Sequence, residues 1–179
     1  MRNAVAKSVI VFLFLLFSAF SVAAQNQLCE LRRKTAPLLL NLQIGMSPQQ
    51  AQAVFGRDLK IKVKKTGERT FFQNYIKKPA TGTLTGVRAL YFRFLNNSLY
   101  QIEIFYEPRI DLKTLENITN ALASQLNFPI SDWQIKYNRA ETICGEISLA
   151  ADNVLNPRIE LTDEIVRAEI EEAREKDKK

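Results

Sequence analysis

A hairpin pattern around Asn96 and Asn97 restricts the fold more than any other part of the sequence. Alternating apolar residues flank the two asparagines, namely Leu90, Phe92 and Phe94 on one arm and Tyr100, Ile102 and Ile104 on the other. This alternation predicts two strands that each bury one face, and asparagine tolerates the positive φ of a tight turn. A two-residue turn would set Phe92 opposite Gln101 and mix the faces. We therefore predict a three-residue loop over residues 95–97, which pairs Phe92 with Tyr100.

Further strands follow from the same period. Three are predicted over residues 59–63, 70–76 and 159–161. In a fourth, Trp133, Ile135 and Tyr137 share a face, and a turn follows at residues 138–139. In a further segment, Ile143, Ile147 and Leu149 share a face. Cys144 has the opposite parity from this last group. Either it lies on the outer face, where the N-terminal segment would have to cover it, or a bulge at Gly145 resets the phase.

Capping residues mark the start of a first helix. Ser47 precedes Pro48, and Gln50 follows three positions after the serine, which together form a capping box with proline at the first helical position. The apolar stripe of this helix consists of Ala51, Val54 and Phe55, and Gly56 is expected to end it. Residues 28–34 are expected to form a shorter helix that ends before Pro37.

Two more helices are predicted in the second half of the chain. Asp111 is expected to cap a helix whose apolar stripe is Leu112, Leu115, Ile118, Leu122 and Leu126. Thr162 or Asp163 is expected to cap a charged C-terminal helix with a thin apolar line of Ile165, Ala168 or Glu169, and Ala173. The elements together predict an α+β fold, a mostly antiparallel sheet of about five or six strands with the helices that begin at Ser47 and Asp111 packed on one face. No internal sequence repeat and no linker divides it.

The first 24 residues have the features of a signal peptide. Arg2 and Lys7 make a basic start, residues 9–20 are apolar apart from one serine, and small residues lead up to Ala24. Because the apolar run is short for a membrane span, we favour cleavage after Ala24 over an uncleaved anchor. Cleavage leaves residues 25–179 as a single domain without a membrane span, located in the periplasm or secreted. A lipid anchor is disfavoured because bulky Leu28 precedes Cys29.

The two cysteines of the chain both follow this leader. An even number of cysteines in an exported protein favours pairing, so we predict a Cys29–Cys144 disulfide. Two buried free thiols are the alternative. A zinc site is disfavoured, because the chain has no histidine to complete the ligand shell.

The absence of histidine also excludes imidazole-based triads and acid–base chemistry. Acidic pairs such as Glu103 with Glu107 and Glu169 with Glu172 are expected on solvated faces, where carboxylates stay ionised. No glycine-rich phosphate loop occurs in a strand–loop–helix context. We therefore predict neither a cofactor nor a metal site, and no enzymatic activity.

Basic side chains form the main surface signal. They are Lys60, Lys62, Lys64, Lys65, Arg69, Lys77 and Lys78. They could bind an anionic partner such as an envelope polymer, lipid headgroups or an acidic protein. We favour the other interpretation, in which lysines protect an exposed edge strand from pairing with other chains. Nucleic-acid binding ranks below both because it conflicts with export.

The segment from Gly45-Met46-Ser47 to Phe55-Gly56, followed by strands and the hairpin, resembles small envelope domains of the SmpA/OmlA barrel-assembly lipoprotein type. The architecture is also similar to that of β-lactamase inhibitor proteins. The resemblance covers residues 40–106 and implies helices on an antiparallel sheet that binds proteins without catalysis. The expected function is thus an exported binding or scaffold module of the cell envelope, whose partner is another envelope or secreted protein. The alternatives are a secreted enzyme inhibitor and, least favoured, a small hydrolase.

Overall fold

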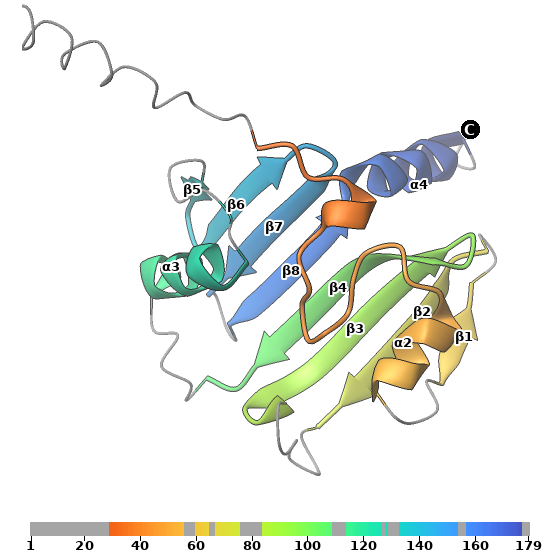
Figure 1. The fold of residues 1–179 in the computed structure, drawn as a ribbon, viewed down its shortest axis with the longest axis horizontal. Helices are drawn as coiled ribbons and strands as arrows, with labels where there is room; N and C mark the ends of the chain where they lie inside the picture. The colour runs from red at the N-terminus through yellow and green to blue at the C-terminus, as the bar shows by residue number, and fades with distance from the viewer. Residues whose placement is uncertain are drawn as a thin grey trace, which may run out of the picture.

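An eight-stranded antiparallel sheet forms the centre of the fold, with the strand order β1-β2-β3-β4-β8-β7-β6-β5 (Figure 1). The structure is a computed structural model that describes residues 29–55, 60–64, 67–75, 84–108, 114–126, 128, 133–153 and 157–176. The strands are β1 (Ile61–Val63), β2 (Arg69–Asn74), β3 (Val87–Leu95), β4 (Ser98–Tyr106), β5 (Gln134–Lys136), β6 (Arg139–Cys144), β7 (Ile147–Asp152) and β8 (Arg158–Asp163). The helices are the 3-10 helix η2 (Arg33–Thr35) and the α-helices α2 (Pro48–Phe55), α3 (Leu115–Leu126) and α4 (Glu164–Lys176). The predicted α+β class is confirmed, with more strands than the five or six expected.

The order of elements repeats along the chain. A helix followed by four antiparallel strands occurs first as α2-β1-β2-β3-β4 and again as α3-β5-β6-β7-β8. The last strands of the two halves, β4 and β8, pair at the middle of the sheet, so that the short strands β1 and β5 become its two edges. One hydrophobic core runs beneath α2 and α3 and includes Phe92, Ile104 and Leu161.

The hairpin between β3 and β4 differs from the predicted register. Asn96 and Asn97 form a two-residue turn with φ of 49° and 64°, so the predicted three-residue loop is wrong. A bulge explains the difference: Phe94 pairs with Leu99, Tyr100 is left over, and Phe92 then pairs with Ile102. The bulge restores the apolar pairing that a regular two-residue hairpin would have lost, and it turns Tyr100 away from the core.

The β6–β7 hairpin also has a two-residue turn. Cys144 pairs with Ile147, and Gly145 between them has a φ of 61°. Cys144 is therefore buried on the core side together with Ile147, whereas Ile143 is 59% exposed on the other side. The predicted face shared by Ile143 and Ile147 is wrong. Of the two alternatives for Cys144, the phase does change at Gly145, through a turn and not a bulge, and the alternative in which the N-terminal segment covers the outer face is wrong.

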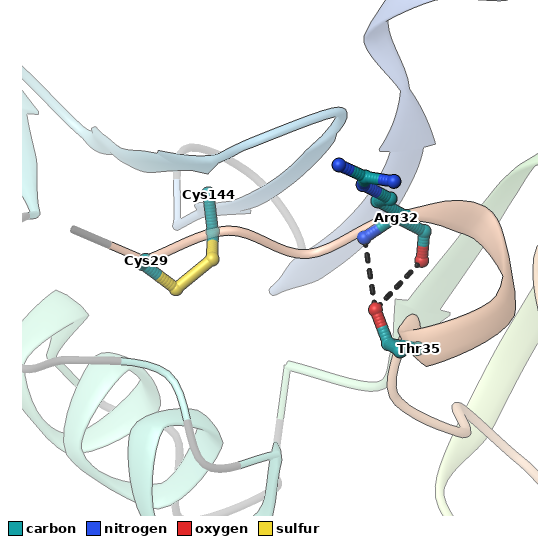
Figure 2. Close-up of a disulfide and its surroundings, with 4 residues drawn as sticks. All are labelled: Cys29, Arg32, Thr35 and Cys144. Carbon is teal, nitrogen blue, oxygen red and sulfur yellow. Dashed lines mark hydrogen bonds between the residues drawn. A yellow bond between two sulfur atoms is a disulfide. The ribbon is translucent and has the colours of Figure 1, made fainter. Parts of the chain in front are cut away.

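The N-terminal strap, residues 29–47, crosses the core side of the sheet and contacts both halves of the fold (Figure 1). The predicted Cys29–Cys144 disulfide joins it to the end of β6 (Figure 2). Just beyond, the Glu146 N–H donates to the Leu31 carbonyl at 2.8 Å. At its other end, the Gly45 N–H donates to the Leu99 carbonyl at 2.7 Å, which joins the strap to β4.

Within the strap, the predicted helix over residues 28–34 is reduced to the single turn of η2. The Arg32 N–H donates to Thr35 Oγ1 at 2.9 Å, and this hydroxyl donates in turn to the Arg32 carbonyl (Figure 2). The Thr35 hydroxyl thus bonds to both the N–H and the carbonyl of Arg32 and stabilises the start of this turn.

The helix caps are local features, and most of them are as predicted. Ser47 and Gln50 make the capping box of α2 with reciprocal bonds of 2.8 and 3.2 Å. Asp163 caps α4 by accepting from the Ile165 and Val166 N–H groups. Gly56, the predicted end of α2, lies outside the described residues.

The start of α3 and the buried side of α4 differ from prediction. Thr114 caps α3 by accepting from the Asn117 N–H at 3.1 Å, and Asp111, the predicted cap, lies outside the described residues. In α4 the buried residues are Val166 and Ile170, so the predicted apolar line through Ile165 is wrong. The line shifts because α4 packs on Tyr100, which the bulge has displaced.

The edge strands bury less than their alternation predicts. Val63 of β1 is 68% exposed, and only Ile61 reaches the core. In β5 all three residues are exposed, and Tyr137 follows in a turn instead of sharing a strand face with Trp133. An edge strand has a neighbour on one side only, which leaves its apolar side chains partly uncovered.

Candidate binding face of the sheet

The sheet has a second face, on the side away from α2 and α3, which we call the polar face. Its register places side chains of neighbouring strands next to one another: Phe72 with Tyr91, Arg93 with Gln101, and Glu103 with Glu160. The face continues onto β7 and β6 through Ser148, Asp152, Arg139 and Ile143. It therefore crosses both halves of the fold.

Helix α4 lies across one end of the polar face. Ser148 of β7 donates to Glu164 in the first turn of the helix. Tyr100 packs against Val166 and Ile170, and Arg174 near the end of the helix is 3.4 Å from Glu68. These contacts lead from β7 across β4 to the start of β2, so they leave the opposite end of the polar face uncovered by α4.

A connected set of ion pairs, the arginine–carboxylate network, begins at Arg93 near Tyr100 and extends to the uncovered end. Its members are Arg93, Glu103, Arg139, Glu141, Asp152, Arg158 and Glu160. Arg93 is 2.9 Å from Glu103, Arg139 is 3.0 Å from Asp152, and Arg158 reaches both carboxylates. Gln101 adds a bond of 2.7 Å to Glu160. The network joins β3, β4, β8, β7 and β6 and so crosses the seam between the halves.

The centre of the network is layered, with arginine outside and the carboxylates of Glu103 and Glu160 beneath, whereas Glu141 at its margin is as exposed as Arg139. The side chains of Arg93, Arg139 and Arg158 are 29–31% exposed, whereas those of Glu103 and Glu160 are 7% and 11% exposed. Burial raises the pKa of Glu103, an effect that Arg93 opposes and neighbouring Glu160 reinforces. A molecule that approaches this face would meet guanidinium groups first.

Aromatic side chains border the network. Phe72 and Tyr91 are in ring contact at 5.8 Å, and Phe72 is more than half exposed. The Arg93 guanidinium lies over the Tyr91 ring at 4.8 Å, and that of Arg158 lies 5.8 Å from the Phe105 ring. The rings hold the guanidinium groups in place through cation–π contacts.

A second polar group, the Glu68 cluster, joins β1 and β2 to α4. Glu68 is 1% exposed and accepts hydrogen bonds from Lys64 Nζ and the Tyr100 hydroxyl, both at 2.7 Å. Arg174 of α4 approaches the same carboxylate. Burial would raise the pKa of Glu68, but the bonds from Lys64 and Tyr100 outweigh it and hold that pKa below its ordinary value.

The predicted basic patch is only partly gathered. Lys60 and Lys62 lie exposed at the edge beside and in β1, and Lys64 is committed to Glu68. Arg69 pairs with Phe94, whose side chain is on the core side of the sheet, so Arg69 and Lys62 lie on opposite faces. The Arg69 guanidinium donates to Asn97 Oδ1 at 3.4 Å. The remaining members, Lys65, Lys77 and Lys78, lie outside the described residues.

Most of the network residues were not singled out by the sequence. The alternation of the hairpin leaves Tyr91, Arg93, Gln101 and Glu103 on the face opposite Phe92 and Ile102, but the expectation that Glu103 is solvated is wrong, since it is 5% exposed. Arg139, Asp152, Arg158 and Glu160 carried only a weak signal, the alternation of polar with apolar residues along β6, β7 and β8.

Comparison with family models, curated proteins and solved structures finds no match to this chain. Within the described residues, no group of three or more cysteine, aspartate and glutamate side chains could hold a metal ion. In that same part of the chain, no helix is long and apolar enough to cross a membrane.

Proposed function

We propose that this chain is an exported, non-enzymatic module that binds another envelope or secreted protein through its polar face. Tyrosine, phenylalanine and arginine are the residues that protein interfaces favour, and they surround and cover the network of this face. The leader-like first 24 residues support export, and the Cys29–Cys144 disulfide suits an oxidising compartment. The resemblance to SmpA/OmlA-type domains supports a role in protein binding.

The observation that carries the proposal is the layering of the arginine–carboxylate network. Its central carboxylates, Glu103 and Glu160, are already buried against three arginines, and Asp152 and Glu141 are paired with arginine as well, so docking a partner would desolvate few groups that are not paired beforehand. The outer guanidinium groups can still donate to carboxylates of a partner. The geometry thus favours a protein with an acidic surface that also offers apolar contacts to Phe72 and Tyr91.

The test is retention of envelope proteins on the immobilised domain. We expect one dominant protein to be retained by the wild type and by Val54→Ala, a control at an exposed position of helix α2. The double variant Phe72→Ala/Tyr91→Ala should weaken this binding by about 2 kcal/mol, or about 30-fold, because aromatic anchors dominate interfaces. Equal retention by all three proteins would refute the polar face as the binding surface. If the retained protein is an enzyme that loses activity, the module is an inhibitor.

A further inference from the structure

The tip of the β5–β6 hairpin, residues 136–139, carries an aromatic side chain that the fold does not use. Tyr137 is 100% exposed, whereas the other tyrosines of the described residues are buried or half-buried. Lys136 pairs with Arg139, so Tyr137 and Asn138 form the whole turn. A ring in full contact with water contributes nothing to the stability of its own domain.

The backbone at this position disfavours tyrosine as well. Tyr137 has a φ of 55°, a left-handed value that is unusual for a bulky residue. It occupies the first central position of a two-residue hairpin turn, where a positive φ normally selects glycine or asparagine. Asn138, the next residue, does not share the positive φ. The position with the left-handed backbone is thus occupied by tyrosine, although asparagine, which tolerates a positive φ, is the next residue.

The tip is nevertheless held in a fixed position. The Asn153 N–H donates to the Asn138 carbonyl at 3.0 Å, which ties the turn to the end of β7. Arg139, directly after the turn, is bound to Asp152 at 3.0 Å and belongs to the arginine–carboxylate network. The exposed ring is thus presented from a rigid backbone that adjoins the uncovered end of the polar face.

From the exposure, the backbone strain and the fixed backbone together, we infer that Tyr137 is an anchor that enters a pocket on the protein bound by the polar face. This inference rests on the proposed function. A tyrosine on a fixed backbone has only two side-chain angles to order on binding and offers both an apolar ring and a hydroxyl. Lys136 beside it is exposed, so the fitting pocket is apolar at its floor and carries carboxylate at its rim.

The test places a photoreactive side chain at the tip of the full-length protein. Tyr137→p-benzoylphenylalanine is irradiated in envelope extract, next to Phe72→p-benzoylphenylalanine on the polar face and Val54→p-benzoylphenylalanine on α2 as a control. We expect positions 137 and 72 to give an adduct with the same protein, and position 54 to give none. Excess unlabelled wild type should abolish the adduct at position 137.

A second variant separates binding from folding. Tyr137→Gly relieves the positive φ, so its Tm should rise by about 2 °C. As an unlabelled competitor it should need at least about tenfold more protein than the wild type, because it lacks the anchor. A competitor that is more stable yet weaker cannot owe its weakness to unfolding.

The outcomes distinguish the two proposals. An adduct from position 72 without one from position 137 would overturn the anchor and leave the proposed function standing. No adduct from either position would overturn both. Equal competition by Tyr137→Gly, the same adducts from position 54, or labelling of lipid in place of protein would each overturn the anchor.

Discussion

At Gly145 the backbone of the N-terminal strap passes directly against the β6–β7 turn. A Cβ at this position would lie 2.5 Å from the Leu31 carbonyl oxygen and 2.8 Å from the Leu31 nitrogen. Both are backbone atoms held by the bond between Leu31 and Glu146 and by the neighbouring disulfide. The strap can therefore reach Cys144 only because residue 145 has no side chain, and the φ of 61° adds a second reason for glycine.

We expect Gly145→Ala to lower the free energy of unfolding by about 3 kcal/mol, since it combines a left-handed alanine with a backbone clash. Gly67→Ala is the matched control, because Gly67 also has a positive φ but nothing within 4 Å of its Cβ position. The control should lose only about 1 kcal/mol. Urea unfolding of both variants measures the difference, and equal losses would contradict a clash with the strap.

The lowered pKa of Glu68 predicts how the free energy of unfolding responds to acid. Its pKa is lowered in the folded protein, so its contribution is complete above its ordinary value of 4.5 and is lost as the pH falls through the lower folded value. Glu68→Gln should therefore cost about 1–3 kcal/mol at pH 7 and flatten the decline of stability below about pH 5. Urea midpoints measured from pH 7 to pH 3 test this.

Glu103 is the control of opposite sign. Its pKa is raised in the folded state, so its ionisation works against folding as the pH rises through that value. Glu103→Gln should remove this opposing slope and leave the decline on the acid side at least as steep as in the wild type. A profile for Glu68→Gln that is parallel to the wild-type profile would show that the Glu68 cluster does not set the acid response.

At the scale of elements, β1 offers the clearest test of the basic residues. It is an edge strand of three residues. The Lys64 N–H donates to the Glu68 carbonyl on the β2 side, so alternation directs the backbone groups of Ile61 and Val63 outward. Lys60 and Lys62 flank this open edge, which suits edge protection. Lys64 is excluded from the test because it holds Glu68.

We expect Lys60→Val/Lys62→Val to self-associate, as light scattering would show, because the edge loses its charge. Lys60→Glu/Lys62→Glu should remain monomeric and change stability by no more than about 0.5 kcal/mol. If the lysines bind a polyanion instead, the glutamate variant should lose salt-sensitive retention on an anionic matrix. Unchanged retention of the glutamate variant would end the anionic-patch interpretation.

Elements whose determinants are local could be predicted from the sequence, and the others could not. The capping box at Ser47 involves partners three positions apart, and the alternation of apolar and polar residues that predicts β3 and β4 lies within each strand. The bulge at Tyr100 depends instead on its bond to Glu68, 32 positions away, and on packing against Ile170 of α4. Neither contact can be inferred from the hairpin sequence, and without the bulge a two-residue turn would set Phe92 opposite Gln101. The sequence therefore favours the three-residue loop, which is wrong.

The arrangement of the whole molecule depends on the disulfide and on the β4–β8 seam. The sequence predicted the disulfide because its leader-like start favours export and two cysteines allow only one pairing. It did not predict the seam, because nothing in the two halves specifies that their last strands are neighbours. The arginine–carboxylate network spans that seam, with Glu103 opposite Glu160, and was missed for the same reason.

We expect Cys29→Ser/Cys144→Ser to lower the free energy of unfolding by about 4–5 kcal/mol, the value for a loop closed over 115 residues. Guanidinium unfolding measures the loss. Reduced wild type is the control and should unfold at the midpoint of the double variant. A loss below about 1 kcal/mol would mean that the hydrogen bonds of the strap hold it without the covalent link.

Because its two anchoring points belong to different halves, the strap must dock late in folding. Hairpins closed by two-residue turns form within about 1–10 μs, whereas the strap has no complete binding surface until β4 and the β6–β7 hairpin lie in one sheet. Until then, the apolar surface that receives Leu42 and Ile44 stays open to water and to other chains. With two cysteines, no wrong bridge can form within the chain. Disulfide formation is therefore expected after the sheet is nearly complete. The rate at which the strap docks then determines how long this apolar surface can bind other chains and aggregate.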